Sequence, residues 1–238
     1  MGKITGEVVL PDGRGGPHAF VADLSSLVID DDDHRHLTRV LRLRDGQPMT
    51  LGDGVGRWCP VVFRSEGNPE QSGEVIVVPK PEPSLAVGFS LIKGDRPELV
   101  IQKLTELGVD RILPLMAERS VVHWNDAKAV HQVERFRRVA RSAAMQSRRV
   151  WLPAVDELAP VARIAGDESL GDELAVAEPG GALLDSSVRL VLVGPEGGWT
   201  TEELADRRTI GLGPTVLRSE TAAIVAGTLL TARRDGRI

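Results

Sequence analysis

The chain has 238 residues, of which 42% are hydrophobic and 26% charged, so it can bury a large core and is not expected to be disordered. It has no apolar run of the roughly 18 residues that span a bilayer, and its first residues lack the apolar stretch of a signal peptide. The single cysteine, Cys59, excludes a disulfide framework, and no common zinc spacing occurs. We therefore expect a cytoplasmic protein with no metal site and no membrane partner.

The net charge of −5 weighs against a general nucleic-acid binder, because phosphate neutralisation needs cations. The cations are, however, unevenly distributed. Residues 128–149 hold seven of them against one acid, Glu134, and a second group follows the acidic run 30–33: Arg35, Arg39, Arg42 and Arg44. Such local clusters indicate selective contact with RNA, and the alternative is that they are solvated helix faces.

The first 80 residues predict a small β domain. Short β-rich runs are separated by glycine and turn residues, which is typical of a small barrel or sandwich. These runs are 4–10, 20–22, 48–51, 58–64 and 74–78. One basic helix interrupts them, with Asp33 as its predicted N-cap and with Leu37, Val40 and Leu41 at helical spacing. Prolines at 79, 81 and 83 then predict an extended connector and a domain boundary.

Beyond this connector, strands and helices alternate, which predicts an α/β fold. Four apolar runs have the length and composition of buried strands: 85–92, 111–115, 174–177 and 190–193. The predicted helices are 97–107, 130–145, one from 202, and one from 220 to about 233. Pro97 suits the first turn of the first helix, and Gly108 suits its end.

The segment 190–204 carries the first chemical signal. A buried strand ends at Gly194, a loop with two further glycines follows, and Thr200 or Thr201 can cap the next helix. In open α/β sheets, ligands bind at such strand ends, where glycines let the backbone approach them closely. Glu196 and the lack of Gly-Lys-Ser/Thr argue against a phosphate loop. The alternative is a purely structural turn.

A second glycine loop, 211–214, precedes the last helix, which Ser219 and Glu220 can open. Arg218 stands at the entrance of this helix. It can grip a carboxylate or phosphate with two hydrogen bonds, or increase the acidity of a nearby proton. The alternative is a salt bridge from Arg218 to Glu220 or Glu196.

These two loops, Gly194-Pro-Glu-Gly-Gly198 and Leu212-Gly-Pro-Thr-Val-Leu-Arg-Ser-Glu-Thr-Ala222, resemble the paired signature of the RsmE family. That family comprises 16S ribosomal RNA uridine-N3 methyltransferases of the SPOUT superfamily. Further pieces similar to the family occur in the same order: 36–42, 93–96, 102–109, 118–120 and 146–149. The resemblance implies an α/β SPOUT domain with a trefoil knot at 81–238 and a PUA-like, RNA-binding β-barrel at 1–80.

The resemblance also implies a cofactor, a partner and site residues. The cofactor is S-adenosyl-L-methionine, bound by the backbone around Gly194, Gly197, Gly198, Leu212, Gly213 and Leu217, with 178–181 as a third wall. Arg218 would stabilise the uracil anion or anchor the target phosphate, and Glu196 would accept a proton or orient the loop. The RNA partner, 16S rRNA or the assembled small subunit, would contact Arg39, Arg42, Arg138, Arg141, Arg148 and Arg149. A homodimer is expected. The small residues Ala222, Ala223, Ala226 and Gly227 would permit close helix contact between two copies, and the alternative is that they pack within the monomer.

Some features differ from the family pattern or leave alternatives open. His18 stands where the family usually has an arginine, Met145 where it has an acid, and the stretch 203–211 is shorter than usual.

Trp199 either stacks on a base or packs under its loop. Three other functions remain: a SPOUT enzyme acting on a ribose 2′-hydroxyl or on transfer RNA, a non-catalytic ribosome-assembly protein, and a small-molecule-binding α/β protein.

Overall fold

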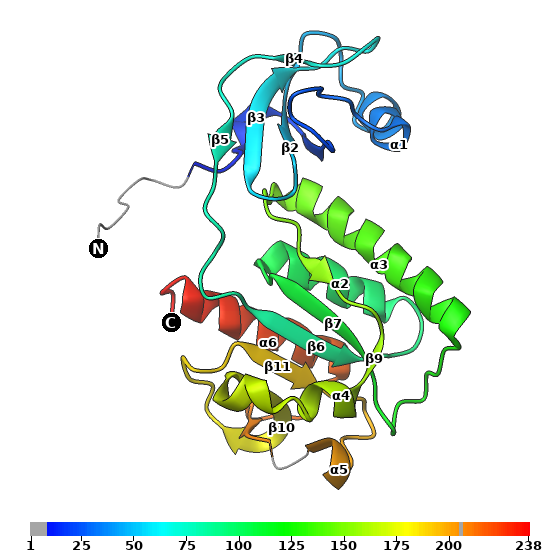
Figure 1. The fold of residues 1–238 in the computed structure, drawn as a ribbon, viewed down its shortest axis with the longest axis vertical. Coiled ribbons are helices and arrows are strands. Elements are labelled where there is room, and N and C mark those ends of the chain that lie inside the picture. The colour runs from blue at the N-terminus through cyan, green and yellow to red at the C-terminus, as the bar shows by residue number, and fades with distance from the viewer. Residues whose placement is uncertain (1–8, 205–206) are drawn as a thin grey trace. The chain divides into compact units, whose positions relative to one another are not determined.

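The computed structural model describes residues 9–204 and 207–238, which form two compact units (Figure 1). The first unit comprises Met1–Pro81 together with Ala144–Leu152, and the second comprises Glu82–Ala143 together with Pro153–Ile238. Most of the predicted strand at 4–10 lies outside the described residues. No helix in the described ranges has the length and apolar character needed to cross a membrane.

Within the described residues, the first unit is built on a five-stranded sheet. Its strands are β1 (His18–Phe20), β2 (Pro48–Gly52), β3 (Arg57–Val62), β4 (Glu70–Gln71) and β5 (Ile76–Val77). Strand β1 pairs in parallel with β2, and β3 pairs antiparallel with β2, β4 and β5. Its core is a cluster of fully or nearly fully buried side chains that includes Ala19, Leu37, Met49, Leu51, Val61 and Phe63.

The helical insertion of this unit differs in detail from the prediction. Helix α1 spans Asp31–Arg35 and continues directly into a π-helical turn, His36–Val40. Asp30 is the N-cap, because its Oδ1 accepts the Asp33 N–H at 2.8 Å. The prediction of Asp33 as the cap was therefore wrong by one turn: Asp33 lies inside the helix and is buried.

The second unit contains a seven-stranded parallel sheet with the order β12-β10-β11-β6-β7-β8, and β9 also pairs with β7. The strands are β6 (Ala86–Ser90), β7 (Arg111–Met116), β8 (Ala154–Val155), β9 (Ala159–Pro160), β10 (Leu174–Ala182), β11 (Leu190–Val193) and β12 (Thr209–Ile210). The four apolar runs predicted as strands are thus confirmed. Strand β10 continues five residues past its predicted end at Ala177.

Helices cover both faces of this sheet (Figure 1). They are α2 (Arg96–Leu107), α3 (Asp126–Ser147), α4 (Val161–Ala165), α5 (Thr201–Leu204) and α6 (Ser219–Arg234). Alternate residues of β11 separate the two cores: Val191 and Val193 join the cluster with α2, α3 and α6, whereas Leu190 and Leu192 join the cluster with α4. The α/β class is therefore confirmed, with one apolar layer on each side of the sheet.

Candidate functional site

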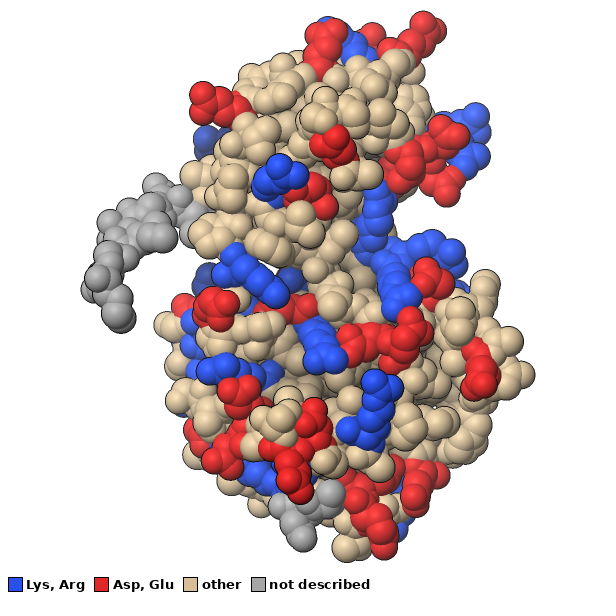
Figure 2. All heavy atoms as spheres, in the orientation of Figure 1, with Lys and Arg blue, Asp and Glu red and all other residues tan. Residues whose placement is uncertain are grey.

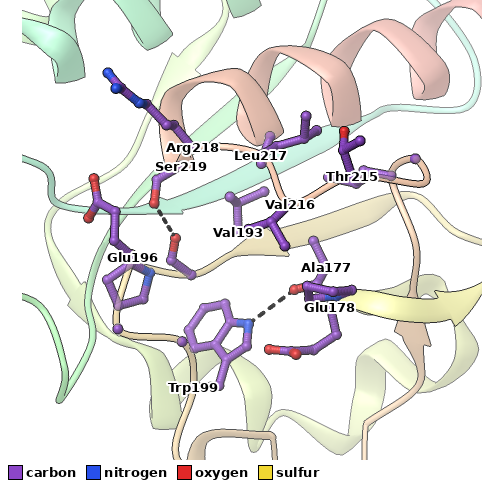
Figure 3. Close-up of a pocket in the computed structure, with 18 residues that line it drawn as sticks. Ala177, Glu178, Val193, Glu196, Trp199, Thr215, Val216, Leu217, Arg218 and Ser219 are labelled. Carbon is purple, nitrogen blue, oxygen red and sulfur yellow. Dashed lines mark hydrogen bonds between the residues drawn. The ribbon is translucent and has the colours of Figure 1, made fainter.

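The two glycine loops meet at one cavity of about 500 Å³, beside the middle of β10 and beyond the carboxyl ends of β11 and β12 (Figure 3). The first loop follows β11 and the second follows β12, and both of these strands pair in parallel with β10, so the two loops emerge at the same edge of the sheet. The lining residues come from three segments: Ala177–Pro179, Val193–Trp199 and Leu212–Ala222. Not every residue of the third segment lines the cavity. All six predicted cofactor-binding residues line the cavity, as do both predicted catalytic residues.

The first glycine loop is supported from below by Trp199. The indole is 6% exposed, and its Nε1–H donates to the Ala177 carbonyl at 3.3 Å (Figure 3). A Cβ on Gly194 would lie 2.8 Å from the Trp199 ring, so only glycine permits this packing. Gly198 has a left-handed φ of 69°, which allows the loop to turn back. Of the two alternatives for Trp199, the structure favours packing under the loop.

A capping box anchors the end of this loop. The Thr200 hydroxyl accepts the Glu203 N–H at 3.1 Å, and the Glu203 carboxylate accepts the Thr200 N–H at 3.0 Å. The other oxygen of Glu203 accepts the Glu118 N–H at 2.8 Å, although the side chain is almost completely buried. Glu203 therefore joins the loop after β11 to the loop after β7. The Thr-x-x-Glu spacing in the sequence is the signal of this capping box, but the sequence analysis named only the threonine as a cap and missed Glu203.

The second glycine loop crosses the end of β10 at very close range. The Gly211 N–H donates to the Ala182 carbonyl at 2.8 Å, and a Cβ on Gly181 would lie 2.5 Å from the Ile210 backbone. The Ser219 hydroxyl then donates to the Gly194 carbonyl at 2.7 Å, which ties the start of α6 to the first loop (Figure 3). Sequence reasoning gave Ser219 only a helix-opening role and missed this contact.

Arg218 is exposed at the N-cap position of α6. Its side chain extends away from Leu217 and Val216 at the lip of the cavity (Figure 3). Among the residues that the structure describes, it makes no ion pair, so the alternative of a salt bridge to Glu196 or Glu220 is wrong.

Those two carboxylates instead face Arg96, at the start of α2. Its Nη1 lies 3.7 Å from Glu196 and 3.6 Å from Glu220. One guanidinium thus links the first glycine loop to the first turn of α6. Because the Glu196 carboxylate forms an ion pair with Arg96, the geometry favours a role for Glu196 in orienting the loop over a role as proton acceptor. The segment 93–96 had been noted in the sequence without any role for Arg96.

The cavity has the properties that an adenosyl cofactor requires. Its volume falls within the range of small-ligand sites, and it combines apolar walls with exposed backbone groups. Val193, Val216 and Leu217 provide the apolar contacts (Figure 3). At Gly198 and Gly213, no described atom outside the glycine and its two chain neighbours lies within 4 Å of a would-be Cβ, so the backbone there is open to a ligand.

Comparison with known proteins identifies the family. The model of the RNA methyltransferase domain family matches residues 79–231. Ribosomal RNA small subunit methyltransferase E of Mycobacterium bovis is 36% identical over 218 residues, covering 84% of this chain and 83% of that protein. The chain belongs to the ribosomal RNA small subunit methyltransferase E (RsmE) family. The Bacillus subtilis member is 30% identical over 229 residues, covering 87% and 90% of the two chains.

A solved structure of an RsmE protein agrees with this assignment. The enzyme from Neisseria gonorrhoeae, bound to S-adenosyl methionine, superposes with a TM-score of 0.77 at 26% identity. The match covers 91% of this chain and 97% of that one. The fold similarity therefore extends over nearly the whole length of both RsmE proteins.

The six arginines predicted to contact RNA are divided between the two units of this RsmE chain. Arg39 and Arg42 are exposed in the first unit, where Arg42 has an unusual left-handed φ of 54°. Arg138, exposed, and Arg141, partly exposed, belong to the part of α3 in the second unit. Arg148 and Arg149 follow α3 in the first unit. Arg148 donates to the Gly16 carbonyl at 3.0 Å, so it also has a structural contact.

His18 is buried in the first unit and not presented to a partner. The ring is 3% exposed, and its Nδ1 lies 2.8 Å from the Thr50 hydroxyl. Burial, with a further contribution from the charge of Arg148, lowers the pKa of His18 to about 4. His18 therefore offers no exposed side chain to RNA in this protein.

Proposed function

We propose that this protein transfers a methyl group from S-adenosyl-L-methionine to N3 of a uridine in 16S ribosomal RNA of the small subunit. Membership of the RsmE family makes it an S-adenosylmethionine-dependent rRNA methyltransferase. The uridine N3 target follows from the resemblance of the two signature loops to the family. The observation that carries the proposal is that both loops line one cavity, with Arg218 at its lip.

The cofactor would be held by the backbone of Gly194, Gly197, Gly198, Leu212, Gly213 and Leu217. When bound, it supplies a methyl group already activated by its attachment to a sulfonium. The adenine would lie against Val193, Val216 and Leu217, with Glu178 and Pro179 forming the third wall. The chain has to position the acceptor in line with this group and to exclude water. Such positioning contributes about 7–11 kcal/mol to lowering a barrier in favourable cases.

Uracil N3 is a weak nucleophile while it carries its proton, so the site must stabilise the anion that forms when this proton leaves. The negative charge of that anion spreads to the two carbonyl oxygens of the base. Arg218, which has no acidic partner among the described residues, can donate hydrogen bonds to one of these oxygens or to the target phosphate. Glu196, which faces Arg96, orients the loop in this proposal.

The domain and assembly predictions belong to the same proposal. Residues 1–80 would form a PUA-like RNA-binding barrel, and residues 81–238 a SPOUT domain whose chain is knotted around the cofactor site. A homodimer is also proposed, although the small-residue face of α6 is already used: Gly227 packs against Leu104 and Val109 of the same unit.

The role of Arg218 is tested by substitution. The variant Arg218→Ala should lose methyl transfer by about 100-fold or more, because it removes a donor to the developing anion. Its affinity for S-adenosylmethionine, measured by calorimetry, should stay close to that of the wild type. Arg218→Lys, which keeps the charge and loses the paired donors, should be intermediate. Loss of cofactor binding in Arg218→Ala would contradict the assigned role.

The substrate is tested with small subunits purified from a strain that lacks the enzyme. After incubation with the protein and S-adenosylmethionine, base-resolution mapping of the RNA should locate one N3-methylated uridine. A methylated ribose, or transfer only to transfer RNA, would favour the other SPOUT activities. Cofactor binding without transfer to any RNA would favour a non-catalytic ribosome-assembly role.

A further inference from the structure

Two cations at the carboxyl edge of the second unit's sheet have no role in the site described so far. Lys93 lies three residues beyond the end of β6, and Arg119 lies three residues beyond the end of β7. Strands β6 and β11 are parallel neighbours, and β7 is next to β6. Because these strands are parallel, Lys93 and Arg119 emerge at the same edge of the sheet as the first glycine loop. Both side chains are exposed.

A direct contact places Arg119 beside this loop, and a short chain distance places Lys93 near it. The Arg119 Nη1–H donates to the Gly197 carbonyl at 3.3 Å, and a Cβ on Gly197 would lie 3.1 Å from the Arg119 Cβ. Lys93 precedes Arg96 by three residues, which span at most about 11 Å. Arg96 in turn faces Glu196 of the same loop at 3.7 Å. Lys93 and Arg119 therefore flank the loop that forms the cavity wall.

The described residues provide no acidic group that neutralises the charges of these two side chains. Within the described parts of the chain, neither has a carboxylate partner, whereas other arginines of this unit do: Arg96, Arg111, Arg135, Arg137, Arg189 and Arg208. On the face drawn in Figure 2, basic and acidic side chains are likewise interspersed. Arg119 uses one donor on Gly197, which leaves four N–H groups for a ligand. Uncompensated cations in a protein of net charge −5 indicate an anionic partner.

We propose that Lys93 and Arg119 bind backbone phosphates of the RNA on either side of the nucleotide that enters the cavity. The inference rests on the proposed function and extends it to the mode of substrate binding. A base that leaves its stack to reach a pocket must have its backbone held in place. Phosphate contacts supply this positioning without reading the sequence. The two cations suit the task because they come from different loops that border the same cavity wall.

The test compares RNA binding by Lys93→Ala, Arg119→Ala and a control, Arg237→Ala. Arg237 is also an exposed arginine, but it follows the far end of α6, about 24 Å from the helix start at the cavity. Affinity for labelled 16S ribosomal RNA is measured by fluorescence anisotropy over a series of salt concentrations. Lys93→Ala and Arg119→Ala should each weaken binding and reduce the slope of log affinity against log salt by about 0.7, as for one phosphate contact on a single strand. Arg237→Ala should match the wild type.

Calorimetry with S-adenosylmethionine tests whether the two cations bind RNA phosphates or the carboxylate of the cofactor. Lys93→Ala and Arg119→Ala should bind the cofactor as tightly as the wild type does. Reduced cofactor affinity with an unchanged salt slope would instead assign the cations to the cofactor carboxylate and overturn the inference, as would slopes identical to that of Arg237→Ala. Changed slopes together with a failure to map any methylated uridine would leave the phosphate contacts standing and refute the proposed function.

Discussion

At the scale of single residues, His18 makes the stability of the first unit depend on pH. Its pKa is lowered from 6.5 to about 4 in the folded state, so the unfolded state binds this proton more readily. The neutral ring therefore contributes stability that is fully present above about pH 6.5 and is lost as the pH falls toward 4. From the shift, this contribution is on the order of 3 kcal/mol.

The measurement is urea unfolding of the wild type and of His18→Gln between neutral and mildly acidic pH. The free energy of unfolding of the wild type should fall more steeply with decreasing pH than that of the variant, because glutamine does not titrate. Carboxylates titrate in both proteins and cancel in the difference. Parallel pH profiles would show that His18 is not held neutral by burial.

Glu203 is a second residue whose contacts predict a measurable effect. Its buried carboxylate accepts backbone N–H groups from Thr200 and Glu118. Glu203→Ala should destabilise the protein by about 1–3 kcal/mol for each N–H left without an acceptor. It should also weaken binding of S-adenosylmethionine, because the glycine loop loses its anchor.

The control is Glu202→Ala, which removes the same charge from the exposed neighbouring position. Urea unfolding and calorimetry with the cofactor should leave Glu202→Ala near the wild type, with Glu203→Gln in between. If Glu202→Ala and Glu203→Ala behaved alike, the effect would be one of charge and not of the two hydrogen bonds.

At the scale of elements, the sequence predicts best those segments whose local pattern and burial agree. Strands β6, β7, β10 and β11 could be identified because both faces of each are buried, which produces continuous apolar runs. Strands β4, β8, β9 and β12 have only two residues each, too few for any periodicity. The cap at Asp30 was missed because the run 30–33 offers four equivalent aspartates, and the π-helical turn shifts the spacing that would choose among them.

The last helix is held at its far end by a buried ion pair. Arg234 Nη1 lies 2.6 Å from Asp110 Oδ2, with side-chain exposures of 8% and 7%, and Arg234 also donates to the Gly108 carbonyl. Arg234→Ala should lower the free energy of unfolding by about 3–5 kcal/mol, because Asp110 then remains as a buried charge. Urea unfolding measures this loss. The double variant Arg234→Met/Asp110→Leu should recover much of it, and a double variant no better than Arg234→Ala would contradict this explanation.

At the scale of the whole molecule, the sequence predicted which two segments form the site but not how they are joined. Glycines and a strand end are local signals, and both loops were found from them. The contacts that bring the loops together connect residues far apart in the chain: Ser219 with Gly194, Arg96 with Glu196 and Glu220, and Glu203 with Glu118. Contacts between polar side chains so far apart in the chain depend on how the sheet and helices pack. They leave no periodic pattern in the sequence from which they could be predicted.

The homodimer is the last prediction, and two exposed apolar side chains suggest where a second copy would bind. Val216 lines the cavity and is 82% exposed, and Leu183, one residue beyond β10, is 88% exposed. Large apolar groups bordering a site are commonly covered by a partner. Sedimentation at micromolar concentration should therefore give twice the chain mass of 25.7 kDa. Leu183→Glu should shift the protein to the monomer and weaken cofactor binding, since the partner would complete the cavity lip. A wild-type monomer would refute the dimer, and a dimeric Leu183→Glu variant would place the interface elsewhere.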